Sequence, residues 1–415
     1  MSSSEIGDLR VDGARLWDTL MQLAEIGATP RGGSNRQALT DDDKRGRDLF
    51  VRWCEEAGCS VEVDQIGNIF ARRSGEAQAD PVLLGSHLDT QPTGGRFDGV
   101  YGVLAGLEVV RTLNERDVHT RAPLEIAVWT NEEGSRFTPA MLGSGVWSGV
   151  FDLSETRAIE DKQGLCLGDE LARIGYAGEA PARARPLRAA FEVHIEQGPI
   201  LEREDLQIGV VTGIQGLRWY DVSLVGEPCH AGPTPMEGRR DPFRALPPIL
   251  DGCYALAEQY APWGRATFGD IRAEPGSRNT VPERVILNAD LRHPDAEVLD
   301  EMDTALRALV RKEAEAHAVE GRVDEHWHMP VTTFAPECVD AVRGATERLG
   351  YSHMEMVSGA GHDSLYVAGV APTSMIFVPC EGGVSHNEGE QASPDDLEAG
   401  CNVLLHAALD MASRE

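Results

Sequence analysis

The sequence has little positive charge, no closely spaced cysteine pairs and no long hydrophobic run. Lys and Arg number 38 against 68 Asp and Glu, which gives a formal net charge of −30. Proteins that bind nucleic-acid phosphates show the opposite balance, and an anionic membrane surface is equally unsuited as a partner. The charge still allows a small anionic substrate where an arginine or a metal ion reverses the local field.

The cysteines and the N-terminal residues predict a cellular compartment. The eight cysteines form no C-x-x-C pair, and a chain of this size needs no disulfides to stabilise its core. The first ten residues are polar and acidic, without the apolar segment of a secretory signal. No stretch approaches the roughly 18 apolar residues that a membrane span needs. We therefore expect reduced thiols and a cytoplasmic protein whose partners include neither membranes nor nucleic acids.

The first half of the chain predicts an α/β domain. Hydrophobic residues make up 41% and charged residues 26% of the 415 residues, which is globular composition and enough length for two domains. Short apolar segments alternate with helix-length ones, which indicates a sheet with helices on both faces. The predicted strands are 61–63, 68–71, 82–84, 124–129 and 189–195, and the predicted helices are 41–58 and 100–113.

A different pattern begins near residue 212 and predicts an inserted domain. The order strand, helix, strand, strand, helix, strand is typical of two helices on an antiparallel sheet, as in ferredoxin-like folds. These elements are 220–225, 242–260, 266–271, 285–291, 296–318 and 322–327. We assign 213–329 to this α+β domain. Residues 1–212 and 330–415 then form the other domain, completed by a helix at 336–349, a strand at 373–378 and a last helix from 394.

Five positions with metal-binding side chains follow predicted strands or lie beside glycines. They are His87, Asp98, the pair Glu132–Glu133, His194 and His386. Chemistry in α/β sheets collects at the carboxyl ends of the strands, and imidazole and carboxylate are ligands of zinc, manganese or cobalt. A two-metal site needs a carboxylate that bridges ions about 3.5–4 Å apart. Of two adjacent glutamates, one can bind metal while the other acts as a general base.

Each of these positions also has a common structural explanation. A histidine at a strand end is usually solvated or hydrogen-bonded, an aspartate between glycines usually belongs to a turn, and two glutamates often form a charged loop. The five positions together favour a metallohydrolase. A protein that binds a ligand without turning it over stays open as an alternative.

Longer motifs resemble one protein family in order along the chain. They are GSHLDTQPTGGRFDGVYGVLAGLEV, WTNEEGSRF, HIEQGPILE, HAGPTPMEGRRD, PGSRNTVPE, SGAGHDS and VSHNEGE. The sequence resembles the ureidohydrolase branch of the metal-dependent aminoacylase–carboxypeptidase superfamily over about residues 20 to 410. The resemblance implies a mixed-sheet catalytic domain that hydrolyses the ureido C–N bond of N-carbamoyl-L-amino acids to the amino acid, ammonia and carbon dioxide. Allantoate amidohydrolase, β-ureidopropionase and, more distantly, an aminoacylase or dipeptidase acting on acyl amides are the alternatives.

The resemblance also implies roles at a dinuclear metal site. It implies two divalent ions per subunit, which could be zinc, manganese, cobalt or nickel. His87 and His194 match ligands of one ion, Glu133 and His386 match ligands of the other, and Asp98 matches the bridge. Glu132 matches the general base, and Asp89 matches a carboxylate that orients the His87 ring.

Substrate contacts and the dimer follow from the same resemblance. The inserted domain corresponds to a lid and a dimerisation surface of a homodimer, in which His230 stabilises the oxyanion from across the dimer. Asn279 and Arg292 match substrate contacts, and a guanidinium suits a substrate carboxylate. Further contacts are predicted for Gln197, for Gln215 and for Gly361 in the pocket-lining segment 359–362. Gln91 departs from the family pattern, where an apolar residue is common.

Overall fold

The computed structural model describes residues 7–414 and consists of two compact units. Unit 1 contains the residues up to Gly213 and those from Thr333 onward, and unit 2 is Ile214–Thr332. The joints predicted from the sequence lie at 212/213 and 329/330. In the described residues, no helix combines the length and the apolar character that crossing a bilayer demands.

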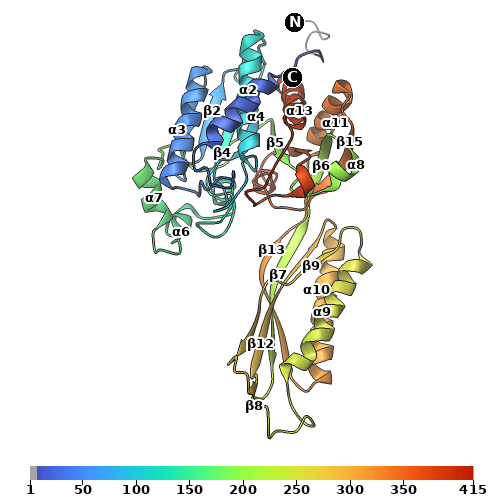
Figure 1. The fold of residues 1–415 in the computed structure, drawn as a ribbon. Coiled ribbons are helices and arrows are strands. Elements are labelled where there is room, and N and C mark those ends of the chain that lie inside the picture. The colour runs from blue at the N-terminus through green and yellow to red at the C-terminus, as the bar shows by residue number, and fades with distance from the viewer. Residues whose placement is uncertain (1–6, 415) are drawn as a thin grey trace. The chain divides into compact units, whose positions relative to one another are not determined.

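Unit 1 is built on a nine-stranded mixed sheet with the order β1-β2-β4-β3-β5-β16-β6-β14, in which β15 also pairs with β6 (Figure 1). The four central strands β4, β3, β5 and β16 run parallel, so their carboxyl ends lie at one edge. The strands are β1 (Ser60–Val63), β2 (Ile69–Arg73), β3 (Val82–His87), β4 (Leu124–Trp129), β5 (Ala189–Ile195), β6 (Ile208–Ile214), β14 (Thr332–Thr333), β15 (His353–Ser358) and β16 (Thr373–Val378). Sequence analysis did not predict β6, β14 and β15.

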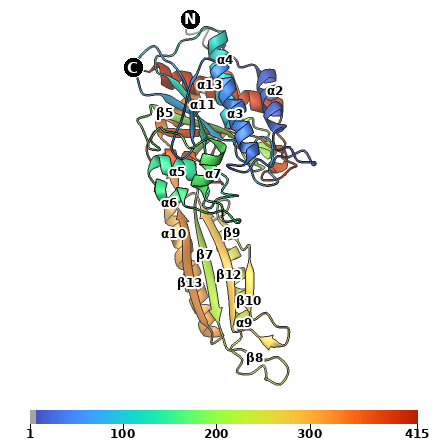
Figure 2. The same cartoon turned by 90° about the vertical axis from the view of Figure 1, so that its left-hand side faces the viewer.

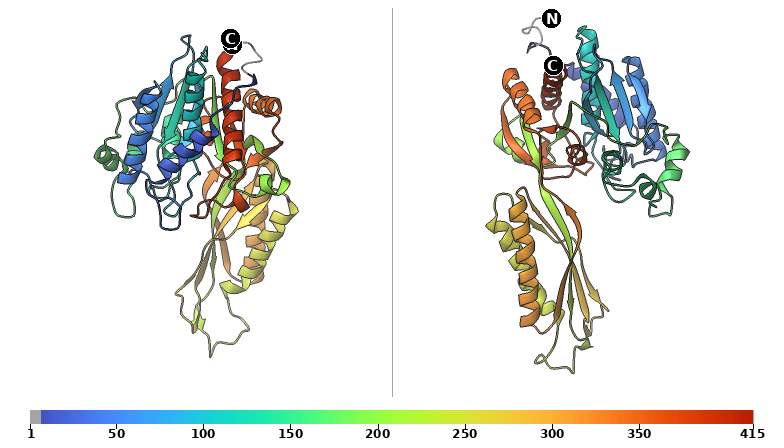
Figure 3. Two further views of the ribbon diagram at one scale, coloured as in Figure 1. Left: turned by 45° about the horizontal axis from the view of Figure 1, so that its top comes forward. Right: turned by 180° about the vertical axis from the view of Figure 1, so that it is seen from behind.

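Helices cover both faces of this sheet, as predicted. Helices α4 (Val100–Glu115), α11 (Pro336–Leu349) and α13 (Pro394–Ser413) pack against the central strands, and α4 and α13 lie side by side (Figure 3). The opposite face is closed by an apolar cluster that includes Trp129 of β4 and Trp147. The other helices are α2 (Gly13–Ala24), α3 (Asp41–Glu56), α5 (Leu142–Ser148), α6 (Leu153–Arg157), α7 (Leu167–Ile174), α8 (Ile200–Glu204), α12 (Ser364–Val367) and the 3-10 turn η1 (Glu381–Gly383).

Unit 2 has the predicted two helices on an antiparallel sheet, but it contains more strands than the predicted β-α-β-β-α-β order. Its antiparallel sheet has the order β10-β12-β7-β13, with β9 also pairing with β12. Helices α9 and α10 lie behind these strands in Figure 2 and bury one face of the sheet in an apolar core around Val222, Leu287 and Met302. The elements are β7 (Gly216–Val225), α9 (Pro242–Gln259), β9 (Arg265–Thr267), β10 (Ile271–Glu274), β12 (Arg284–His293), α10 (Ala296–Ala316) and β13 (Glu320–Met329).

The single strand predicted at 266–271 is wrong. The chain there forms the two short strands β9 and β10, which pair with different parts of β12. Between them, the side-chain oxygen of Asn288 accepts the backbone N–H groups of Gly269 and Asp270 at 2.8 and 2.9 Å. These contacts replace ladder hydrogen bonds, so the strand is interrupted.

A small ribbon extends from the sheet of unit 2. Strand β8 (Cys229–His230) pairs with β11 (Thr280–Val281), and Figure 2 shows β8 at the end of the unit where β10 also lies. His230, a substrate contact implied by the family resemblance, lies in this ribbon, and Asn279 directly precedes β11.

Candidate metal centre and active site

The five predicted metal-binding positions come together at the carboxyl edge of the parallel strands. His87 is the last residue of β3, His194 lies near the end of β5, and Glu132–Glu133 follow β4. Asp98 comes just before α4, and His386 lies in the loop between η1 and α13. Because neighbouring parallel strands end at the same edge of the sheet, residues that are distant in sequence come close together there.

Asp98 lies between two groups of candidate ligands. Its Oδ1 lies 3.1 Å from His194 Nε2 and 3.5 Å from His87 Nε2. Its Oδ2 lies 3.5 Å from His386 Nε2, which is also 3.3 Å from Glu133 Oε2. The groups His87–Asp98–His194 and Asp98–Glu133–His386 each offer three ligand atoms within 4.8 Å of one another. A carboxylate shared by two such groups has the geometry of a bridge between two ions.

The buried histidines present their Nε2 atoms to this carboxylate. His87 Nδ1 lies 2.9 Å from the carbonyl of Asp89, and His194 Nδ1 lies 2.9 Å from the carbonyl of Ile195. Because a carbonyl only accepts, each Nδ1 carries a proton, so Nε2 is the ring nitrogen that a metal ion would take. The backbone N–H of Gly99 donates to His194 Nε2 at 2.9 Å, so an ion bound to this nitrogen would replace that hydrogen bond.

We predicted that the Asp89 carboxylate orients the His87 ring. This is wrong, because a different atom of Asp89 makes the contact. The main-chain carbonyl of Asp89 holds the ring. The Asp89 carboxylate instead accepts the backbone N–H groups of Glu132 and Glu133, both at 3.2 Å. The turn after β3 directs the carbonyl to the ring and the side chain to the loop after β4. Asp89 thus fixes both the ring and the glutamate pair.

The two adjacent glutamates have different surroundings. Glu133 accepts hydrogen bonds from the side chain of Gln91 at 2.7 Å and from its backbone N–H at 3.1 Å, and it faces His386. Glu132 is buried, and its Oε2 lies 3.5 Å from His87 Nε2. Gln91, for which the sequence indicated no contact, thus holds a candidate ligand. Glu132 is placed beside the metal groups without belonging to either of them.

Buried negative charge dominates the site. Burial, with the charge of Asp98 adding to it, raises the pKa of Glu133 to about 8. Burial also raises the pKa of Glu132 well above its usual range, although His87 opposes the shift. In the described part of the chain, the ion-pair partners of Asp98, Glu132 and Glu133 are all histidines. A site with this excess of carboxylate fits divalent cations, which supply the missing positive charge.

The affinity for a divalent ion is expected to rise with pH up to about 8. The metal-free protein holds a proton on Glu133 below its pKa of about 8, and an incoming ion must displace that proton. Each displaced proton makes the association constant rise up to ~tenfold per pH unit below that pKa. Chelator-competition titrations between pH 6 and 8.5 measure this slope. An affinity that falls or stays level over this range would contradict the proposed ligand role of Glu133.

Two residues that sequence reasoning missed support Asp98. The hydroxyl of Ser385 lies 2.7 Å from Asp98 Oδ2 and 3.1 Å from Glu390 Oε2. Glu390 Oε1 accepts the backbone N–H groups of Phe97 and Asp98 at 2.8 and 3.1 Å. Only their position in the motif VSHNEGE, beside His386, could have indicated these two residues. A loop residue that contacts a distant part of the chain leaves no periodic pattern in the sequence.

Glu390→Ala is expected to weaken metal binding about 10–100-fold, the usual cost of removing a group that orients a metal ligand. The change leaves the backbone N–H groups of Phe97 and Asp98 without their acceptor, so the main chain that carries the Asp98 carboxylate is no longer held in place. Metal affinity is measured by chelator competition. Glu381→Ala, an exposed carboxylate in the same segment, serves as the control and is expected to bind metal normally. Equal affinities in the two variants would refute the positioning role.

Gln197 and the segment before His362 lie against the metal groups. The side-chain amide of Gln197 donates to Asp98 Oδ2 at 2.7 Å, and its buried oxygen has no hydrogen-bond partner in the described residues. The ring of His362 stacks edge-on against His194 with centroids 4.7 Å apart, and Gly361 directly precedes it. Burial lowers the pKa of His362 well below its usual range, so its ring is neutral. Gln215 is buried between β6 and β7.

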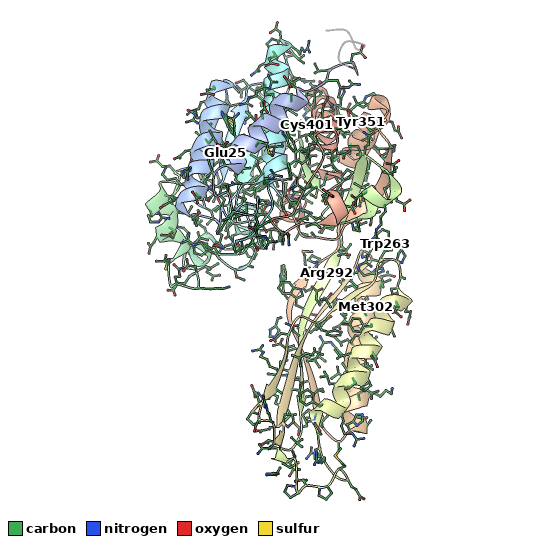
Figure 4. All side chains as sticks on the ribbon, in the orientation of Figure 1. Glu25, Trp263, Arg292, Met302, Tyr351 and Cys401 are labelled. Carbon is green, nitrogen blue, oxygen red and sulfur yellow. The ribbon has the colours of Figure 1, made fainter. Side chains whose placement is uncertain are left out.

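The predicted substrate residues of unit 2 form two separate groups. His230 pairs with Thr280 across the ribbon, and the N–H of Ala231 donates to the carbonyl of Asn279 at 2.8 Å. Arg292 lies at the opposite end of β12 and is labelled in Figure 4. Its guanidinium pairs with Asp290, from Nε to Oδ1 at 2.9 Å and from Nη2 to Oδ2 at 2.7 Å. A substrate carboxylate would have to share Arg292 with Asp290.

Comparisons with known proteins match this chain over nearly its whole length. The model of peptidase family M20/M25/M40 matches residues 83–410. An N-carbamoyl-L-amino-acid amidohydrolase of Rhizobium meliloti is 50% identical over 404 residues, which are 97% of each chain. An allantoate amidohydrolase of Bacillus subtilis (strain 168) is 34% identical over 398 residues, 95% of this chain and 97% of its own.

A solved structure agrees with these sequence matches. The crystal structure of an amidase of the hydantoinase/carbamoylase family from Burkholderia multivorans superposes with a TM-score of 0.93 and 55% identity. The superposition covers 98% of this chain and 99% of that chain. The comparisons confirm the family resemblance and the fold class predicted from the sequence.

Proposed function

Because the chain belongs to peptidase family M20/M25/M40, we propose that it is a metal-dependent amidohydrolase that cleaves the carbamoyl C–N bond of N-carbamoyl-L-amino acids. The observation that carries this proposal is Asp98, which lies between two histidine-containing ligand groups with the buried Glu132 beside them. The 50% identical relative named N-carbamoyl-L-amino-acid amidohydrolase supports the substrate class. The products would be the amino acid, ammonia and carbon dioxide.

The proposal includes two divalent ions per subunit. His87 and His194 would hold one ion, Glu133 and His386 the other, and Asp98 both. Zinc, manganese, cobalt and nickel all accept such ligands, and availability decides among them. When bound, the ions would polarise the substrate carbonyl and make water acidic enough to be deprotonated near neutral pH.

Glu132 would move the proton in the reaction. Its carboxylate would take a proton from the attacking water and return it to the leaving nitrogen, as a general base and then a general acid. Burial raises the pKa of Glu132 above its usual range, so its carboxylate takes up a proton more readily than an exposed one, as a general base must. The contacts of the Asp89 carboxylate to the Glu132 and Glu133 N–H groups would hold the base in place during turnover.

His230 would act at the metal site of a second subunit and help to hold the oxyanion. His230 lies beyond the end of β12 at which Arg284 pairs with Val225, whereas Arg292 lies at the other end. The eight residue steps from Arg284 to Arg292 span roughly 26 Å of strand. One small substrate cannot touch both His230 and Arg292 of the same chain. We therefore propose a homodimer in which each site takes Arg292 and His230 from different subunits.

Mixed dimers are expected to recover activity from two inactive variants. Glu132→Gln removes the base of its own site, and His230→Ala removes the oxyanion donor of the partner's site. Co-expression of the two variants would give heterodimers with one intact site, or about a quarter of wild-type activity in a random mixture of dimers. Ammonia release is measured on heterodimers that are co-purified through two different tags, and about half of the wild-type activity is expected for them. Complete inactivity of these heterodimers would show that His230 serves its own subunit.

A substrate panel tests the proposed reaction against its alternatives. Ammonia release by metal-loaded protein is measured with N-carbamoyl-L-methionine, N-carbamoyl-β-alanine and allantoate, and amine release is measured with N-acetyl-L-methionine. We expect the highest kcat/KM with N-carbamoyl-L-methionine. A preference for allantoate or N-carbamoyl-β-alanine would identify a different ureido acid, and a preference for the N-acetyl compound would overturn the ureidohydrolase assignment.

We also propose that the protein works in the cytoplasm. All eight cysteines are free, which suits a reducing compartment.

A further inference from the structure

The sheet face of unit 2 that carries Arg292 also carries a pair of tryptophans. Trp219 lies directly opposite Asp290 on the neighbouring strand, and its indole N–H donates to Asp290 Oδ2 at 2.9 Å. The ring of Trp327 on β13 lies opposite Trp219, with centroids 4.7 Å apart. Trp219 is 43% exposed. These rings are on the face away from the core that α9 and α10 cover.

Trp219 is exposed and Trp327 is half-buried, although both rings are large and apolar. The helix-covered face buries Tyr220, Val222 and Leu224 of the same strand, so the core of unit 2 does not use these rings. Tryptophan is rigid and amphipathic, and it is over-represented where proteins bind ligands and partners. The contact of Trp219 with Asp290, which also holds Arg292, joins the aromatic pair to the guanidinium.

The charges beside the tryptophans suit an anion. Arg265 lies directly opposite Arg292 on β9, and like charges in such cross-strand pairs are normally destabilising. Asp290 is the single carboxylate among these three charged residues. The Arg265 guanidinium donates to the carbonyls of Pro262 and Gly264, whereas the Arg292 fork could pair with a carboxylate ligand as it does with Asp290.

An amino acid carries its carboxylate and its side chain on the same carbon. A substrate whose carboxylate pairs with Arg292 must place its side chain within a few ångströms of that guanidinium. Trp219 is diagonal to Arg292 across the strands, a separation of roughly 7–8 Å that a large side chain covers. Both ends of such a substrate would find complementary groups on this one face.

We propose that Trp219 and Trp327 bind the side chain of the substrate, and that the enzyme prefers N-carbamoyl-L-amino acids with aromatic or other bulky apolar side chains. This inference rests on the proposed function, which supplies the ureido reaction and the carboxylate role of Arg292. A small side chain leaves the indole rings exposed to water and gains nothing from them. A benzyl or indolyl side chain buries apolar surface against them.

The test is the ratio of kcat/KM for N-carbamoyl-L-phenylalanine to that for N-carbamoylglycine. We expect a ratio of at least roughly tenfold in the wild type, since pocket contacts with an apolar side chain give discrimination of this order. Trp219→Ala is expected to reduce the ratio about tenfold or more, through kcat/KM for the phenylalanine compound. Trp219→Phe keeps an aromatic ring but removes the N–H that binds Asp290, and it is expected to retain most of the selectivity.

Two further variants keep the test decisive. Trp327→Ala removes the second ring without touching Asp290, and it should also lower the ratio even if Trp219→Ala does not fold. Tyr254→Ala removes an exposed aromatic ring of α9, which packs on Phe268, and should leave the ratio unchanged. If the wild type releases ammonia from both compounds and the tryptophan variants keep its ratio, this inference is overturned while the proposed function stands. Absence of ammonia from every N-carbamoyl compound would instead refute the proposed function.

Discussion

Glu132→Gln is expected to lower kcat about 10²–10⁴-fold, the usual contribution of a general base. Glutamine has nearly the same shape and cannot accept the proton of the attacking water. Glu132 belongs to neither group of candidate ligands, so the metal content and KM should change little. Steady-state kinetics together with metal analysis by mass spectrometry separates loss of chemistry from loss of metal.

The control for this variant is Glu196→Gln. Both Glu132 and Glu196 are 8% exposed, but the Glu196 carboxylate accepts the backbone N–H groups of Ile200 and Leu201 at the start of α8. Its replacement should affect stability without the fall in kcat. Full activity of metal-loaded Glu132→Gln would show that another group accepts the proton.

Asp98→Asn is expected to remove at least one ion per subunit and to reduce activity by about 10³-fold or more, because several kcal/mol of charge stabilisation in the transition state depend on the metal. Its two oxygens face different histidine groups. An asparagine offers one oxygen and an N–H₂ group, so one side of the bridge would present a donor to a cation. The loss of metal is measured as metal content after dialysis. The loss of activity is measured with and without excess metal in the assay.

The matched control is Asp64→Asn, another buried aspartate of unit 1. Its carboxylate accepts the N–H groups of Ile66 and Asn68, which are remote in sequence from the candidate ligands. This variant should keep its metal content even if the protein becomes less stable. Two ions per subunit in purified Asp98→Asn would refute the bridging role.

The sequence predicted the parts of the site that follow strands. His87, His194 and the glutamate pair lie where buried strands end, and such strands are visible as apolar runs. The alternation of strands and helices predicted the parallel centre of the sheet, which brings these ends together. Asp98 and His386 were candidates because of their side chains and nearby glycines, and the family motifs added their roles as bridge and ligand.

The contacts made by single atoms could not be predicted. The ring of His87 is held by the carbonyl of Asp89 rather than by its carboxylate, and this depends on the turn after β3. The support of Asp98 by Glu390 joins positions 292 residues apart in sequence. Asn288 interrupts the strand predicted at 266–271 through its side chain, an effect that strand propensity does not contain. Arg292 is paired with Asp290, which no spacing rule indicated.

The most direct test is the stoichiometry of products from N-carbamoyl-L-methionine. Metal-loaded protein is incubated with this compound, and ammonia and methionine are measured over time, then again after chelation and after metal is restored. We predict equal amounts of ammonia and methionine, no reaction after chelation, and recovery when the metal returns. Protein that retains its metals, remains folded and releases neither product would contradict the assignment of this site as a carbamoyl-cleaving metal centre.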